Sequence, residues 1–266
     1  MTVQAYPAVQ LANNSINGFP ISYASTTTIT VGSGICWDSN NVVQIVLGST
    51  DTIGQTTDVP YTINAAINGA GGLDTGTFAA GGTYYVLAIA DSYSNNFPAA
   101  LISLSATAPS MPYGYDSFRV IGAVESGATA IFRPFDMKRA GALASFQYRT
   151  PIIMTAGTSA TSATINLTEV TSGYVAVPIT GLYKVHMNIA YTPTTATNVL
   201  SIKGYDGAAV TTSNTQYNFT GTVSAQVQNE PCSLIVGLNS GVPAVTYLIG
   251  TAGSQTISIV GYDMGL

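Results

Sequence analysis

The sequence predicts an all-β protein made of two antiparallel β-sandwich or jelly-roll-like units that assemble as a trimer. Apolar and polar residues alternate with a period of two, which is typical of half-buried strands, and helical periodicity is nearly absent. Gly, Pro and Asn interrupt the alternation at spacings of about 8 to 12 residues, as in sandwiches and barrels. Charged residues make up only 7% of the chain. A surface so poor in charge favours burial against other subunits.

The individual strands follow from this alternation. In segment 183–191, one face carries Tyr183, Val185, Met187, Ile189 and Tyr191. Segments 83–90 and 232–238 are apolar almost throughout, so we expect strands that are buried on both faces. The pairs 17–18, 68–69 and 206–207 combine Asn or Asp with Gly and predict tight turns with positive φ. Segment 136–146 fits either a short helix or an extended arm.

A boundary between two units is expected between residues 135 and 155. The segments FRVIGAV and ATAIFRPF, which precede it, look like the last hairpin of a first unit. The segment TAGTSATSAT, which follows it, is rich in Thr, Ser, Ala and Gly. The expected organisation is therefore an N-terminal β unit over 1–136, a junction over 137–154 and a C-terminal jelly-roll-like sandwich over 155–266.

Charge is distributed unevenly along the chain. Residues 1–118 contain six aspartates and no Lys or Arg. Segment 119–149, called here the cation-rich segment, contains Arg119, Arg133, Lys138, Arg139 and Arg149. A net charge of −5 argues against a nucleic-acid partner, because phosphate contacts need clustered cations. We expect the cation-rich segment to lie at the junction, against the other half, a neighbouring chain or a capsid.

The sequence offers little for catalysis, and we expect a protein that is not an enzyme and holds no cofactor or metal. Cys36 and Cys232 have no partner in a C-x-x-C motif, so two free, buried thiols are expected. His186 is the single histidine. It falls on the polar face of its strand without a nucleophile motif, so we interpret it as an exposed polar residue and not as a catalytic base. No apolar run is long enough to span a membrane.

Two weaker possibilities concern the loops. Segment 38–41 (DSNN), with Asp58 or Asp91, offers the hard oxygen ligands that calcium prefers, although we expect solvated turns there ahead of a calcium site. Five of the sixteen tyrosines crowd the first half, and we expect core or subunit packing for them ahead of an exposed binding platform. They are Tyr84, Tyr85, Tyr93, Tyr113 and Tyr115.

A run of short motifs over residues 25–135 resembles a β module of bacteriophage tail fibres and other virion surface proteins. The motifs are GSG-x-C-x-DS at 32–39, GGLDTG at 71–76, TYYVLAIADS at 83–92 and LISLSATAPSMPYGYDSFRVIGAV at 101–124. The resemblance implies a scaffold role for GGLDTG, with Asp74 bonded to the N–H groups of its own loop. One departure is that Arg119 stands alone where the family has two adjacent basic residues.

The second half is similar to trimeric jelly rolls of the tumour-necrosis-factor/C1q type, with a generic β-sandwich as the alternative. The similar segments are VPITGLYKVHMNIAYT at 177–192 and TISIVGYDMG at 256–265. In that family the corresponding strands line a threefold axis, so the resemblance implies a homotrimer.

Together these features predict a structural protein on the surface of a bacteriophage virion: a trimeric spike, head fibre or capsid-decorating protein. Its expected partners are copies of itself and other capsid or tail proteins. One alternative is a tail fibre protein that attaches to host surface glycans. Another is a double jelly-roll major capsid protein.

Overall fold

The computed structural model describes residues 15–48, 60–157, 163–169, 172–193, 199–209, 215–220, 228–249 and 253–266. In these ranges every regular element is a β-strand, and the strand pairs are antiparallel. The predicted all-β class with sandwich-like antiparallel sheets is therefore confirmed. Within the same ranges there is no helix long and apolar enough to cross a membrane.

Nine strands form the first unit as three small sheets, ordered β1-β4-β5, β2-β3-β6 and β8-β7-β9. The central strand β7 is buried along nearly its whole length, as its continuous apolar sequence predicts. The strand bounds are β1 (Ile16–Gly18), β2 (Ile21–Tyr23), β3 (Thr28–Val31), β4 (Gly34–Trp37), β5 (Gln44–Leu47), β6 (Tyr61–Asn64), β7 (Thr83–Ala90), β8 (Ala99–Ser103) and β9 (Ser117–Glu125).

The second unit is a pair of five-stranded sheets. One has the order β10-β11-β19-β13-β16, and the other has the order β12-β18-β14-β15 with β17 beside β18. From Val185 onward β13 alternates buried and half-buried residues, as predicted. The strand bounds are β10 (Phe135–Ala140), β11 (Leu143–Gly157), β12 (Ala163–Asn166), β13 (Leu182–Pro193), β14 (Val199–Gly204), β15 (Tyr217–Thr220), β16 (Gln228–Leu234), β17 (Gly237–Asn239), β18 (Val242–Ile249) and β19 (Gly253–Gly265).

Segment 136–146 is a β-hairpin, so the short helix that its composition allows does not form. The strands β10 and β11 pair from Phe135↔Tyr148 to Ala140↔Leu143, and residues 141–142 form the turn. Gly141 has a φ of 59°, the left-handed value that a two-residue hairpin turn requires. Residues 137–154, expected to be a junction, lie within these two strands of the second unit's sheet.

The prediction for segment 232–238 is also wrong, because this segment is not buried on both faces. Strand β16 ends at Leu234, and the following Ile235 and Leu238 are exposed. The predicted positive φ values, in contrast, occur at all three expected turns, at Gly18, Gly69 and Gly207.

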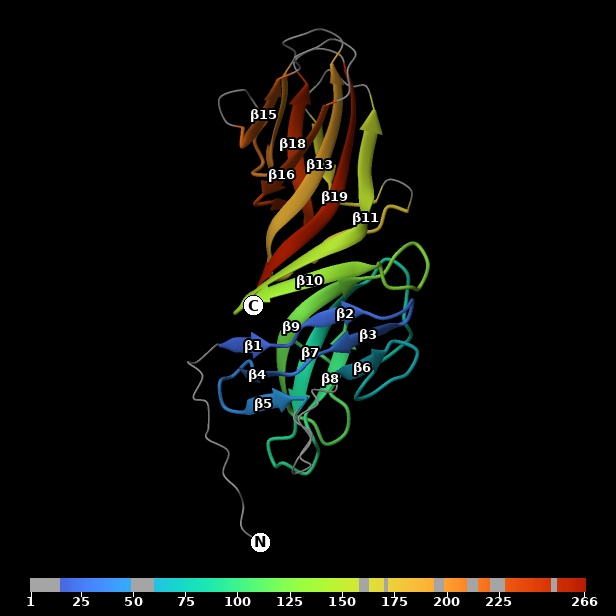
Figure 1. Cartoon of the computed structure of the whole chain (residues 1–266), viewed down its shortest axis with the longest axis vertical. Coiled ribbons are helices and arrows are strands. Elements are labelled where there is room, and N and C mark those ends of the chain that lie inside the picture. The colour runs from blue at the N-terminus through green and yellow to red at the C-terminus, as the bar shows by residue number, and fades with distance from the viewer. Residues whose placement is uncertain are drawn as a thin grey trace.

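The two units stack along the long axis of the molecule, and the C-terminus lies between them (Figure 1). Aromatic rings from the second unit fill the junction: Phe146 stacks on Tyr262 with ring centroids 5.1 Å apart. The Tyr262 hydroxyl then donates to the carbonyl oxygen of Ala123 in β9 of the first unit, at 2.8 Å. One hydrophobic core therefore runs through both units.

Strand β19 leaves room for this packing at Gly261. Gly261 lies opposite Gln147, just before a register shift between β11 and β19, and a Cβ there would collide with the Phe146 carbonyl oxygen. Gly265, four residues later in the same strand, has no neighbouring atom within 4 Å of the position its Cβ would occupy. Gly265 is therefore a matched control for a substitution at Gly261.

We predict that Gly261→Ala lowers the free energy of unfolding by about 1 to 3 kcal/mol, because the added methyl forces the backbones of β11 and β19 apart. Gly265→Ala should change it by less than about 0.5 kcal/mol. Urea unfolding followed by tyrosine fluorescence measures both values. Equal stability of the two variants would contradict the packing described at Gly261.

Candidate functional site

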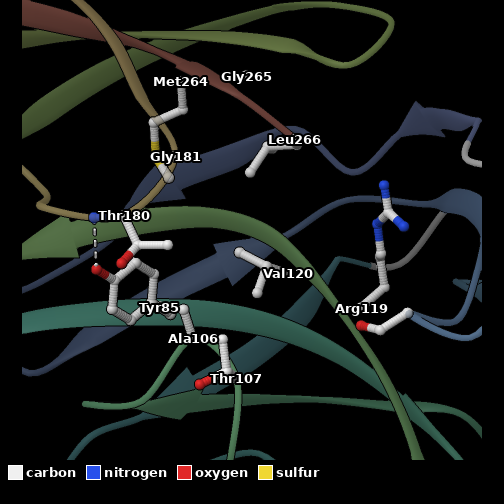
Figure 2. A pocket seen from close by; sticks show the side chains of 11 residues that line it. Tyr85, Ala106, Thr107, Arg119, Val120, Thr180, Gly181, Met264, Gly265 and Leu266 are labelled. Atoms are coloured by element: carbon white, nitrogen blue, oxygen red, sulfur yellow. Dashed lines mark hydrogen bonds between the residues drawn. The ribbon is translucent and has the colours of Figure 1, made fainter.

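A pocket of about 210 Å³ lies between the two units. Its first-unit wall includes Tyr85, Arg119 and Val120, and its second-unit wall includes Thr180 and Leu266 (Figure 2). The backbone N–H of Thr180 donates to the Tyr85 hydroxyl oxygen at 3.1 Å, which joins the two walls. Among the lining side chains Arg119 alone is charged, and it already interacts with neighbouring residues. The pocket thus has no acid–base pair and belongs to the packing of the junction.

The cation-rich segment reaches across this junction, as the sequence predicts. Arg133 forms an ion pair of 3.0 Å with Glu169 of the second unit, and both side chains are largely buried. Arg139 of β10 donates from Nη2 to the Ile121 carbonyl oxygen in β9. Burial lowers the pKa of Arg139 to about 10. The placement at the junction is confirmed for Arg133 and Arg139.

The other cations of the segment lie nearer the surface. Arg149 pairs with Asp136 at 2.9 Å in an exposed position and stands 5.6 Å from the centre of the Tyr23 ring. Lys138 is exposed on β10. The Arg149–Asp136 ion pair stabilises the fold little, because exposed ion pairs are screened by water and salt.

Glu125 is a buried carboxyl at the junction that the sequence reasoning missed. It is 1% exposed, and both of its carboxylate oxygens accept from the Thr83 hydroxyl, at 3.0 and 2.9 Å. Burial raises the pKa of Glu125 to about 8, although Thr83 and the charge of Arg133 oppose the rise. The one sequence signal was a single acid at the end of the apolar strand FRVIGAV.

The raised pKa of Glu125 predicts that stability falls as pH rises. Its contribution is complete below the unfolded pKa of 4.5, where both states bind the proton, and is lost as pH rises through about 8. The loss is on the order of a few kcal/mol at most. Glu125→Gln should remove this slope, because an amide does not titrate in this pH range. The amide can also keep the contact with Thr83. Urea unfolding between pH 5 and pH 9 measures the slope.

Asp136→Asn serves as the control, because it removes an exposed acid and leaves the buried Glu125 in place. This variant should retain the wild-type slope over the same pH range. A Glu125→Gln variant with an unchanged slope would show that Glu125 is not the group that titrates.

His186 joins a hydrogen-bonded row across three neighbouring strands. Its Nδ1 lies 2.7 Å from the Ser233 hydroxyl on β16, and its Nε2 lies 2.9 Å from an Asp263 oxygen on β19. The sequence could not reveal these partners, because they lie 47 and 77 residues away in the chain. Strand register alone brings them together.

This row, Ser233–His186–Asp263, has the residue types of a serine nucleophile relay. Catalysis by such a relay also needs donors aimed at an oxyanion and a place for the substrate. The junction pocket and the loop hollow described below are lined by other residues. What the contacts do provide is cross-linking of β16, β13 and β19 through their side chains.

The cysteines are free and buried, at Cys36 and Cys232. Burial raises the pKa of each thiol to about 12. Both are therefore protonated at neutral pH, and a protonated thiol is a weak nucleophile.

The acids proposed as calcium ligands are engaged by backbone N–H groups. An Asp38 oxygen accepts from Val42 and Val43 at 2.7 and 3.0 Å, which closes the β4–β5 turn. Asp91 accepts from the backbone of its own loop. Asp58 lies outside the described residues. In the described part of the chain no three His, Cys, Asp or Glu residues form a group that could hold a metal ion.

Asp74 of the GGLDTG turn has a wider structural role than its own loop. One oxygen accepts from the neighbouring Thr75 N–H at 2.8 Å. The other accepts from the Ser103 hydroxyl at 2.7 Å and from the Ser110 N–H at 3.0 Å. Asp74 therefore ties the turn to the end of β8 and to the connection that follows it.

The five tyrosines of the first half separate into two groups. Tyr84 and Tyr85 are buried, as expected for core packing. Tyr93 and Tyr113 are among the most exposed side chains of the molecule, and Tyr115 is intermediate. The expectation of core packing therefore fails at Tyr93 and Tyr113, which lie on loops where strand periodicity gives no information.

Comparisons with known proteins leave the family open. No protein-family model matches the chain, and no curated protein matches it. Among solved structures it is similar to a Cry1Da tryptic core variant of Bacillus thuringiensis (9% identity, TM-score 0.23) and to the insecticidal crystal protein Cry7Ca1 of the same organism (10%, 0.23). It is also similar to a structure of infectious bursal disease virus, Gx strain (13%, 0.19).

These alignments cover 94%, 97% and 96% of this chain, respectively. The chain spans about half the length of the two toxins (51% and 53%) and 67% of the viral protein. The low TM-scores carry no argument about fold or function.

Proposed function

We propose that the chain is a structural protein of a bacteriophage virion, carried on the particle surface as a trimeric spike, head fibre or capsid-decorating protein. The proposal rests on one observation. The motifs that resemble a virion module form the structural scaffold of the first unit. Strand β7 of the TYYVLAIADS motif is the buried centre of its sheet, and Asp74 of GGLDTG joins three segments. Motifs that serve as scaffold are expected in a structural protein.

The continuous core supports the same function. Because Phe146 and Tyr262 bind the second unit directly to β9, the two units form one elongated body and not two tethered domains. A projecting virion protein has to transmit load along its length, and a packed junction does so better than a flexible linker.

Trimer formation is assigned to the second unit. Its surface carries the exposed apolar side chains of Ile153, Ile179, Tyr183, Ile235 and Leu238. Apolar side chains that remain exposed on a chain of low charge favour contact with other copies. In the trimeric jelly rolls that the second unit resembles, the corresponding strand lines the threefold axis, so the proposed trimer would bring β13 and its Tyr183 near that axis.

We predict that the purified chain is a trimer and that Tyr183→Glu shifts it to monomers, because a desolvated carboxylate destabilises an apolar interface. Multi-angle light scattering at micromolar concentration measures the mass. Ile67→Glu is the matched control, since both side chains are 51% exposed and Ile67 lies in the first unit. Wild-type protein that is monomeric would overturn the trimer.

Complementation of a phage that lacks the gene tests the virion role. Particles made with the wild-type chain should contain the chain, as detected by mass spectrometry. Antibodies against the chain should bind the intact particles. Particles made with His186→Ala should assemble and infect normally, because the row of His186 links strands within one chain. Its loss should lower stability by about 1 to 2 kcal/mol.

Two results would count against the proposal. Purified particles without the chain would exclude a virion protein. Loss of a hydrolytic activity on host polysaccharide in His186→Ala protein of unchanged fold would identify the Ser233–His186–Asp263 row as a catalytic site.

Attachment to host glycans is the second candidate function. The exposed Tyr93 and Tyr113 favour it.

A further inference from the structure

Two loops form a platform at the end of the first unit that lies away from the second unit. They are residues 91–97, which follow β7, and residues 111–116, which precede β9. Ala90 pairs with Ser117 at this end of the sheet, whereas Thr83 pairs with Glu125 at the junction end. Figure 1 shows the same arrangement, with β9 running from the outer end of the first unit towards β10. We call the two loops the tip platform.

The first loop of the tip platform is held by a buried carboxylate. Asp91 is 8% exposed and accepts from the N–H groups of Tyr93, Asn95 and Asn96 at 2.8 to 3.1 Å. Its Oδ2 also accepts from the Asn96 side-chain amide at 3.2 Å. Ser94 has a φ of 58°, a left-handed value that this ring of hydrogen bonds maintains.

The second loop is bonded to the first at three points. Asp116 accepts from the backbone N–H and the hydroxyl of Ser92. The Asn96 amide donates to the Gly114 carbonyl oxygen at 3.1 Å, and the Tyr115 hydroxyl donates to the Phe97 carbonyl oxygen at 2.9 Å. The tip platform is therefore preorganised, so a ligand would not have to bear the entropy of ordering it.

Three aromatic side chains project from this rigid frame. Tyr93 and Phe97 are each 82% exposed, and Tyr113 is exposed to the full extent of a free side chain. Beside the tyrosines is a hollow of about 490 Å³ that is lined by residues of both loops. Its lining includes Asp91, Tyr93, Asn96, Tyr113 and Asp116.

The composition of the tip platform is that of binding loops. Tyr provides rigid contact area at a small entropic loss, while Ser, Asn and Gly provide adaptable hydrogen bonding. Exposed aromatic rings next to polar groups mark interaction sites, and the volume of the hollow lies within the range of about 300 to 1,000 Å³ that is typical of small-ligand sites.

The side chains of the tip platform favour a saccharide. A sugar ring presents an apolar face of C–H groups that stacks on an aromatic ring, and hydroxyls at its edge that bond to carboxylates and amides. The carboxylates of Asp91 and Asp116 line the hollow and no Lys or Arg does, so an anionic sugar would be repelled. The Asp91 oxygens are already engaged by N–H groups, which disfavours a metal ion as the occupant.

We propose that the tip platform binds a short, neutral saccharide, with Tyr93 and Tyr113 stacking on sugar rings. This assignment deepens the proposed surface role by naming a ligand class and a site. It stands on the geometry of the isolated chain and therefore does not require that the chain be part of a virion.

The test uses the purified full chain and an array of neutral oligosaccharides of hexose, deoxyhexose and N-acetylhexosamine, with sialylated and sulfated oligosaccharides on the same array. Kd values for the best neutral ligand are then measured by saturation-transfer NMR. We expect neutral ligands to bind, and Tyr113→Ala and Tyr93→Ala each to weaken binding by about tenfold. Circular dichroism melts of both variants should match the wild type, because both side chains project into solvent.

Ile67→Ala is the control, since it removes an exposed apolar side chain of the first unit that does not line the hollow. It should leave the Kd unchanged. Absence of binding to every neutral oligosaccharide, binding to anionic ones alone, or unchanged Kd values in both platform variants would overturn the proposal. A chain that is absent from purified particles but binds a neutral saccharide would contradict the virion role and leave the tip platform's assignment intact.

Discussion

The packing of Phe146 and Tyr262 against β9 determines how the two units of this protein are joined. Gly122 in β9 makes the contact possible, because a Cβ there would lie 2.5 Å from Ile21 and 3.1 Å from the Phe146 ring. The Tyr262 hydroxyl then satisfies a carbonyl oxygen of the same strand. Since β19 supplies Tyr262 and β11 supplies Phe146, the central strands of the second unit's sheet are themselves the connection to the first unit.

Few charges are present, and several of them are used inside the structure. Arg133, Arg139 and Glu125 all lie at or near the junction, where each relies on a few polar neighbours. Burial favours the neutral forms of Arg139 and Glu125. Buried groups of this kind stabilise weakly but define one arrangement, because any other leaves them without partners.

The loops of the first unit have two different physical roles. In GGLDTG and in the β4–β5 turn, carboxylates of Asp74 and Asp38 face inward and bond to N–H and hydroxyl groups. At the tip platform Asp91 does the same, but the aromatic residues of that loop turn outward. The same turn chemistry therefore builds a rigid frame in each place, and at the tip platform the frame also presents exposed aromatic rings.

Strand periodicity and turn chemistry were readable from the sequence. The all-β class, the buried strand 83–90 and the positive φ of Gly18, Gly69 and Gly207 follow from residues close together in the chain. Segment 136–146 was harder, because its Lys, Arg, Ala and Leu suit a helix, and Arg139 at an inward position concealed the alternation.

The tertiary structure alone decided what depends on residues far apart in the chain. The partners of His186, the burial of Glu125 and the outward rings of Tyr93 and Tyr113 all result from strand register and loop packing. A sequence pattern records which face of its own strand a residue occupies. It does not record which residue lies opposite on the next strand, and that pairing determines the burial and hydrogen bonding of each candidate site.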